Sequence, residues 1–279
     1  MLLVQAVRER LKEGVQQILE AYLKVMEEID QEELIGSFES VINHFDDMIE
    51  PYAIEISKKL SETFKKLVKQ DLDDRGESMM AASGCLSVIR RILSACQKHP
   101  NVLSQIEEQI YPLILYTCCP KGLEYIEDAI DCSVLLVYHQ KTVSPKMWSL
   151  YEKFIDLILG DKDDEEGEGG ILFDSIQIIQ SFLQNCIKYG GEGFFSHKDS
   201  KGRTPVELIM NFVPDTITIA RGIDPSGMQE AAIALKTLSC VFENHFGKVD
   251  YVLEDTVGLL MEDLNSEDPL PRAYKSFVL

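Results

Sequence analysis

The sequence is poor in positive charge. Its 279 residues carry 27 lysines and arginines against 47 aspartates and glutamates, which gives a formal net charge of −20. Nucleic-acid binding needs clustered cations that displace counterions from phosphates, so this composition argues against direct nucleic-acid binding. It favours basic partners, or serves solubility alone. The sequence also lacks an apolar run long enough to span a membrane, and it lacks the charge order of a signal peptide.

Residue sets that mark metal sites and catalytic centres are missing too. The seven cysteines form no C-x-x-C pair, and the five histidines form no H-x-x-x-H pair. We therefore expect buried free thiols in a reducing compartment, no metal, no cofactor and no enzymatic activity. The stretch from Asp71 to Asp74 resembles the Mg²⁺-binding motifs of helical terpenoid enzymes, but a polar turn between helices is the simpler interpretation.

What the sequence does contain is helical periodicity. Apolar residues recur at steps of three and four residues almost throughout, which places each set on one face of a helix. No alternating strand pattern stands out, so the predicted fold class is all-α. A late example of such a stripe is the set Ala231, Leu235, Leu238, Phe242 and Phe246.

The predicted helices come in pairs that begin near prolines and repeat roughly every 40 to 58 residues, as in HEAT and armadillo repeats with loop insertions. We predict one HEAT-like solenoid segment over residues 1–279, built from antiparallel A and B helices. An irregular helical bundle is the alternative. Both ends of the chain fall inside helical pattern, so we expect a fragment of a longer array. The predicted pairs cover residues 12–48, 51–99, 102–143, 146–190, 204–247 and a truncated 249–279.

An acidic stretch, residues 160–170, interrupts the fourth pair. It does not fit an EF-hand, because neither register places both the required glycine at position six and glutamate at position twelve. We predict a loop between two helices, which acts either as a passive spacer or as a surface for a Lys/Arg-rich protein. Its candidate binding residues are Asp161, Asp163, Asp164, Glu165, Glu166 and Glu168.

A second acidic set lies in the third B helix. Glu124, Glu127, Asp128 and Asp131 follow the i, i+3, i+4, i+7 spacing that gathers side chains on one helix face. A solvated face at a helix start explains the set, since the helix dipole favours carboxylates there. The functional alternative is that these four residues bind a basic protein, because B helices line the concave side of a HEAT solenoid.

Three segments carry a family resemblance: QQILEAYLKVMEEIDQEEL (16–34), FESVINHFDDMIEPYAIEISKKLSETFKKL (38–67) and VSPKMWSLYEKF (143–154). Their order and spacing resemble the middle-to-late repeats of importin-β family receptors, or karyopherins, of the importin seven/eight type. The likeness is best over residues 12–155.

The resemblance implies a nuclear import receptor that shuttles between cytoplasm and nucleus. It further implies cargo on the concave surface, nucleoporin repeats on the convex surface, and cargo release by Ran-GTP, whose main contact in this family lies on N-terminal repeats. A HEAT scaffold subunit of a complex unrelated to transport is the alternative function.

Overall fold

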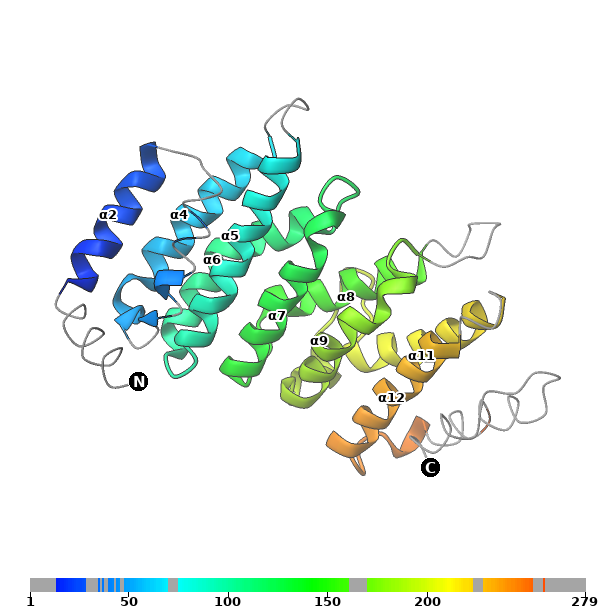
Figure 1. Cartoon of the computed structure of the whole chain (residues 1–279). Helices are drawn as coiled ribbons and strands as arrows, with labels where there is room; N and C mark the ends of the chain where they lie inside the picture. Colours follow the sequence, from blue (N-terminus) through cyan, green and yellow to red (C-terminus); the bar gives the residue numbers. More distant parts are fainter. Residues whose placement is uncertain are drawn as a thin grey trace, which may run out of the picture. The chain divides into compact units, whose positions relative to one another are not determined.

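The protein is described by a computed structural model, shown in Figure 1. The structure describes residues 14–28, 48–69, 75–160, 170–222 and 228–252, together with residue 258 and single positions between 35 and 45. Within this part of the chain every regular element is a helix, as the periodicity predicts. The chain divides into two compact units, Met1–Gln140 and Lys141–Leu279.

The first unit consists of two helical layers (Figure 1). Helix α4 packs beside α2, α5 and α6, while α7 packs beside α5 and α6. The A helices, α2, α4 and α6, therefore form one layer, and the B helices, α5 and α7, form the other. The helices are α2 (Val15–Glu28), α4 (Ala53–Leu67), α5 (Arg75–Ala95), α6 (Pro100–Thr117) and α7 (Ile126–Gln140), with 3-10 turns η2 (Glu50–Tyr52) and η4 (Leu123–Tyr125).

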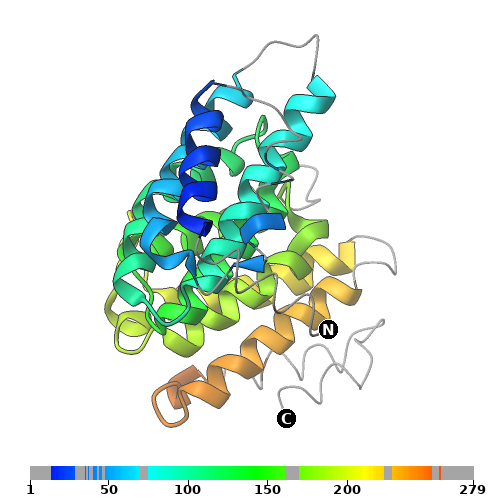
Figure 2. The same cartoon turned by 60° about the vertical axis from the view of Figure 1, so that its left-hand side comes forward.

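The second unit repeats this arrangement. Helix α8 packs beside α9 and α11, and α12 packs beside the same two helices (Figures 1 and 2). Its elements are α8 (Pro145–Leu159), η5 (Phe173–Ser175), α9 (Ile176–Tyr189), the short α10 (Gly193–Ser196), α11 (Pro205–Gly222), α12 (Met228–Asn244) and η7 (Asp250–Val252).

Local sequence explains where the A helices begin. Pro100, Pro145 and Pro205 open α6, α8 and α11, because a first-turn proline needs no backbone N–H partner. Ser144 caps α8 by accepting a hydrogen bond from the Met147 backbone N–H at 3.2 Å. In α11, Thr204 and Glu207 form a reciprocal capping box, with the Glu207 carboxylate 2.7 Å from the Thr204 backbone nitrogen.

Aromatic side chains fill the core of the second unit. Tyr151 is fully buried and donates to the Pro205 carbonyl at 3.3 Å, which ties α8 to the start of α11. The rings of Phe154 and Phe182 meet edge to face at 5.3 Å and join α8 to α9. Trp148 packs so closely over Gly190 that a Cβ there would lie 2.6 Å from the indole.

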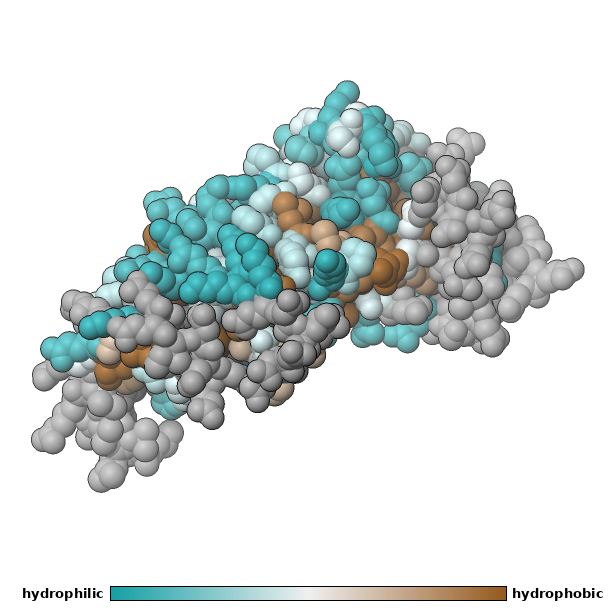
Figure 3. Space-filling view, turned by 90° about the horizontal axis from the view of Figure 1, so that it is seen from above, coloured by the Kyte–Doolittle hydropathy of each residue, from teal (hydrophilic) through white to brown (hydrophobic). Residues whose placement is uncertain are grey.

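The apolar stripe predicted from Ala231 to Phe246 is wrong at its C-terminal end. The helix stops at Asn244, and Phe246 is 91% exposed. His245 takes the inward position: its ring stacks on Phe194 at 4.7 Å, and its Nε2 donates to the Ile187 carbonyl at 2.8 Å. The backbone turns away at Gly247, where φ is +79°. Elsewhere the described surface is largely hydrophilic in the view of Figure 3, with apolar groups between polar ones.

Candidate binding surface on helix α7

The four predicted carboxylates of the third B helix lie in η4 and in the first turns of α7, which follows it. Glu124 belongs to η4, and Glu127 and Asp128 fall in the first turn of α7, where the helix dipole favours negative charge. Asp131 follows one turn later. Helix α7 packs beside α5, so the α5 side chains decide which of these carboxylates reach solvent.

Asp131 is paired with Arg90 of α5. The Arg90 Nη1 donates to the Asp131 Oδ2 at 2.6 Å, and the two side chains are 35% and 43% exposed. The hydrogen bond to Asp131 raises the pKa of Arg90, and the nearby charges of Asp131 and Asp128 act in the same direction. A pair this exposed contributes about 1 kcal/mol or less to stability, because solvent screens it.

Asp128 is also held by α5, since its carboxylate accepts a hydrogen bond from the Ser83 hydroxyl. Behind it lies Cys132, whose burial raises the pKa of the thiol far above its ordinary range. The Cys132 Sγ lies 3.7 Å from the Leu86 carbonyl oxygen of α5. This thiol is therefore a packing group, as expected for buried cysteines.

The predicted acidic face thus divides into two kinds of carboxylate. Asp128 and Asp131 are half-buried and bonded to α5, whereas Glu124 and Glu127 are exposed. Sequence reasoning missed Ser83 and Arg90. A usable signal existed, because Ser83, Ser87, Arg90 and Ser94 form a polar stripe at helical spacing on α5.

The six carboxylates predicted in the acidic stretch, residues 160–170, all fall within 161–169 and so lie outside the described residues. The two flanking glycines are described. Helix α8 ends at Leu159 and is followed by Gly160, whose φ is +72° and whose N–H donates to the Asp156 carbonyl at 2.9 Å. The Gly170 N–H donates to the Ile158 carbonyl at 2.7 Å, so both ends of the stretch are fixed at the last turn of α8.

In the part of the chain that the structure describes, no group of three His, Cys, Asp or Glu side chains is placed to hold a metal ion. The same residues include no helix long and apolar enough to cross a membrane. The aspartate-rich residues 71–74 lie outside the described part.

Comparisons with known proteins agree with this helical architecture. A probable importin-7 homologue of Dictyostelium discoideum is 26% identical over 97% of this chain and 24% of its own length. An importin-β-like SAD2 homologue of Arabidopsis thaliana is 23% identical over 93% of this chain and 24% of its own length. Importin-8 of Mus musculus is 24% identical over 53% of this chain and 15% of its own length.

This chain therefore spans about a quarter of the length of the first two relatives. No family profile matches the sequence, and no solved structure matches it. The stacked helix pairs and these relatives together define a helical-repeat protein of the HEAT solenoid class. The chain is similar to importin-β family proteins of the importin-7/8 type, in agreement with the predicted resemblance, and the predicted all-α HEAT fold class is confirmed.

Proposed function

We propose that this chain is the cargo-binding segment of a nuclear import receptor and that it recognises basic protein cargo. The observation that carries the transport role is the set of importin-7 and importin-8 relatives. The net charge of −20 and the exposed Glu124 and Glu127 support a basic partner, because opposite charge steers association. The acidic stretch, residues 160–170, is proposed as a second cargo contact.

The same proposal covers the remaining partners. Ran-GTP and nucleoporin repeats bind the whole receptor, which shuttles between cytoplasm and nucleus. The receptor acts by binding and release without catalysis. Within this segment, Glu124 and Glu127 make the contacts that depend on charge, and Asp128 and Asp131 hold α7 against α5 and contribute less.

The test compares two charge-matched variants of the full chain. We expect Glu124→Gln with Glu127→Gln to weaken binding of a fluorescent Lys/Arg-rich peptide about threefold at low salt, mainly through slower association. The matched control is Glu55→Gln with Glu62→Gln, which removes two exposed charges from α4 instead. Stopped-flow fluorescence measures both. Equal association rates for the two variants would show that α7 is only a solvated face.

A further inference from the structure

Two neighbouring methionines of α5 are exposed to solvent. Met79 and Met80 lie in the second turn of the helix, and they are 39% and 60% exposed. Single exposed apolar residues are common on protein surfaces and need no explanation. Two long thioether side chains next to each other leave a larger apolar area in water, and a partner that covers this area gains from its burial. Which partner fits them depends on the groups around them.

The packing of α5 against α7 fixes what lies next to the methionines. Three contacts join the two helices, and each links a residue of α5 to one that follows 41 to 46 positions later: Ser83 to Asp128, Leu86 to Cys132 and Arg90 to Asp131. The helices therefore run parallel. Met79 precedes Ser83 by four residues, and Glu124 precedes Asp128 by four, so each lies one turn earlier on the same face. This register places Met79 beside Glu124.

The charges around the methionines are mainly negative. The two facing segments, residues 79–90 of α5 and residues 121–131 of the turn, η4 and α7, carry four carboxylates and two cations, Arg90 and Lys121. Arg90 is already bound to a carboxylate, that of Asp131. Glu124 and Glu127 are exposed, so their charges face solvent next to the apolar area.

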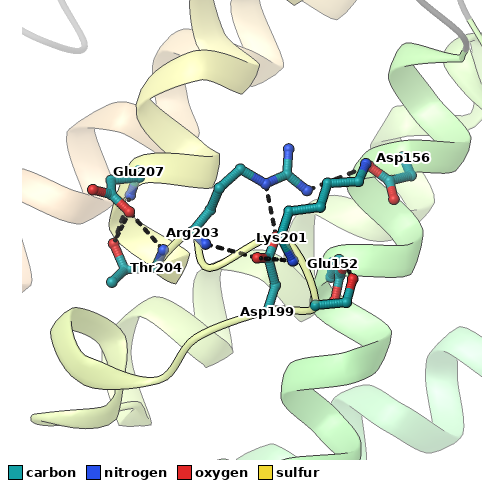
Figure 4. A network of polar contacts seen from close by, with 8 residues as sticks. Glu152, Asp156, Asp199, Lys201, Arg203, Thr204 and Glu207 are labelled. Carbon is teal, nitrogen blue, oxygen red and sulfur yellow. Dashed lines mark hydrogen bonds and ion pairs between the residues drawn. The ribbon is translucent and has the colours of Figure 1, made fainter.

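The acidic group at the start of α11 differs in this respect, as Figure 4 shows. The Asp199 side chain is only 3% exposed, and it accepts from the backbone nitrogens of Lys201 at 2.9 Å and Arg203 at 2.7 Å. Burial alone would raise the pKa of Asp199, but the hydrogen bonds and charge of Arg203 outweigh burial and lower it. That carboxylate holds a turn together, whereas Glu124 and Glu127 remain accessible to a partner.

We propose that the two methionines and the two exposed glutamates together bind a segment of the basic cargo in which a large apolar side chain stands next to lysines or arginines. The apolar side chain packs against Met79 and Met80, whose unbranched, flexible side chains adapt to partners of different shape. The cations of the segment lie near Glu124 and Glu127, because opposite charges attract. The inference rests on the proposed function for the basic character of the partner, and it adds an apolar requirement that charge alone does not impose.

The experiment compares two peptides of equal length and charge on the full chain. One is acetyl-KKLKKLKK-amide, the leucine peptide, and the other is acetyl-KKSKKSKK-amide, the serine peptide. By calorimetric titration at low salt, we expect the leucine peptide to bind about fivefold more tightly, because the complex buries apolar side chains. Labels of ¹³C in the methyl groups of the nine methionines locate the contact. The signals of Met79 and Met80 should shift most, and saturably.

Variants separate the apolar contribution from the charged one. Met79→Gln with Met80→Gln should remove the advantage of the leucine peptide and leave binding of the serine peptide unchanged. The matched control, Phe246→Gln with Tyr251→Gln, removes two exposed apolar side chains from the second unit and should keep the advantage. Thermal melts of both variants check that the fold is intact.

Three results would overturn the inference: equal affinities of the two peptides for the unchanged chain, a leucine advantage that persists in the methionine variant, or an equal loss in the control. Failure of the proposed function gives a different pattern. In that case the leucine advantage and the shifts of Met79 and Met80 remain, while Glu124→Gln with Glu127→Gln binds both peptides as tightly as the unchanged chain.

Discussion

At the scale of the residue, burial decides which protonation state of a side chain the folded protein stabilises. His245 lies beyond the last residue of α12, where a helix dipole would favour a charged imidazole. The residue is instead only 8% exposed, its ring is stacked on Phe194, and desolvation lowers its pKa. The hydrogen bond to the Ile187 carbonyl and the charge of Glu192 act in the opposite direction, and Lys248 adds to the lowering. The folded state therefore holds this histidine neutral.

This leads to a pH prediction. Because the unfolded chain binds a proton at this histidine more readily than the folded chain, stability falls as pH drops below the ordinary value of 6.5. We expect urea unfolding to show a smaller loss of stability from pH 7.5 to pH 5.5 in His245→Gln than in the unchanged protein. Glutamine keeps an N–H for the Ile187 carbonyl but does not titrate.

The acidic residues of this unit do not confuse the measurement. The pKa values of Asp199 and Glu207 are lowered in the folded state from their ordinary values of 3.8 and 4.5. Their stabilising contribution is therefore complete when the pH is above those ordinary values, and it is lost only as the pH falls below them. A control variant, His44→Gln, changes an exposed histidine. If His245→Gln and the unchanged protein lose the same stability between pH 7.5 and pH 5.5, protonation of His245 does not lower the stability of the fold.

At the scale of the element, the turns that lead into the B helices α7 and α9 share a glycine that lies close to the preceding A helix. A 3-10 turn precedes both α7 and α9, and a glycine stands just before or near each turn, at 122 and 170. A Cβ at Gly122 would lie 2.4 Å from the Tyr116 carbonyl oxygen, and one at Gly170 would lie 2.2 Å from that of Leu157. Both glycines therefore let the chain touch the backbone of the preceding A helix.

We predict that Gly122→Ala destabilises the protein by about 2 kcal/mol, because the added methyl group meets fixed backbone atoms. Cys119→Ala, an exposed change in the same turn, should alter stability by less than about 0.5 kcal/mol. Chemical denaturation monitored by circular dichroism measures both. If Gly122→Ala and the control have equal free energies of unfolding, Gly122 does not lie as close to the Tyr116 carbonyl as described.

These elements also show how far sequence could predict the fold. The A helices begin where proline and a capping residue mark them, because those signals are local, as at Ser144 and Pro145. The B helices α7 and α9 begin at Ile126 and Ile176, each directly after a 3-10 turn. The 3-10 turns before them depend on contact with another helix, which periodicity does not report.

The candidate site was predictable to a similar extent. Helical spacing placed Glu127, Asp128 and Asp131 together, since that requires only the period of one helix. It could not separate the exposed Glu127 from Asp128 and Asp131, because the separation depends on Ser83 and Arg90 of a neighbouring helix.

At the scale of the whole molecule, a net charge of −20 raises a question that no single residue answers. A strongly acidic protein attracts any basic ligand over a Debye length of about 8 Å at physiological ionic strength. Faster association with basic cargo could therefore arise from total charge alone, wherever the acids lie. If the acidic stretch has a specific role, neutralising its charges must slow association with basic cargo more than neutralising the same number of charges elsewhere.

Two variants of equal net charge decide between these causes. One neutralises the stretch by changing Lys162 to Gln and its six acids, Asp161, Asp163, Asp164, Glu165, Glu166 and Glu168, to Asn or Gln. The other neutralises five dispersed, exposed acids, Glu55, Glu62, Glu108, Glu243 and Asp250. Both carry a net charge of −15, five less negative than the unchanged chain.

We predict that neutralising the stretch slows association with a Lys/Arg-rich peptide at low salt by about threefold more than neutralising the dispersed acids, and that the difference shrinks as salt is added. Helicity and melting temperature should hardly change, because Gly160 and Gly170 anchor the stretch through backbone hydrogen bonds that neither variant touches. Stopped-flow measurements at several salt concentrations give both the rates and their salt dependence. If the two variants associate equally fast, the stretch is a spacer, and total charge alone accounts for the attraction of basic cargo.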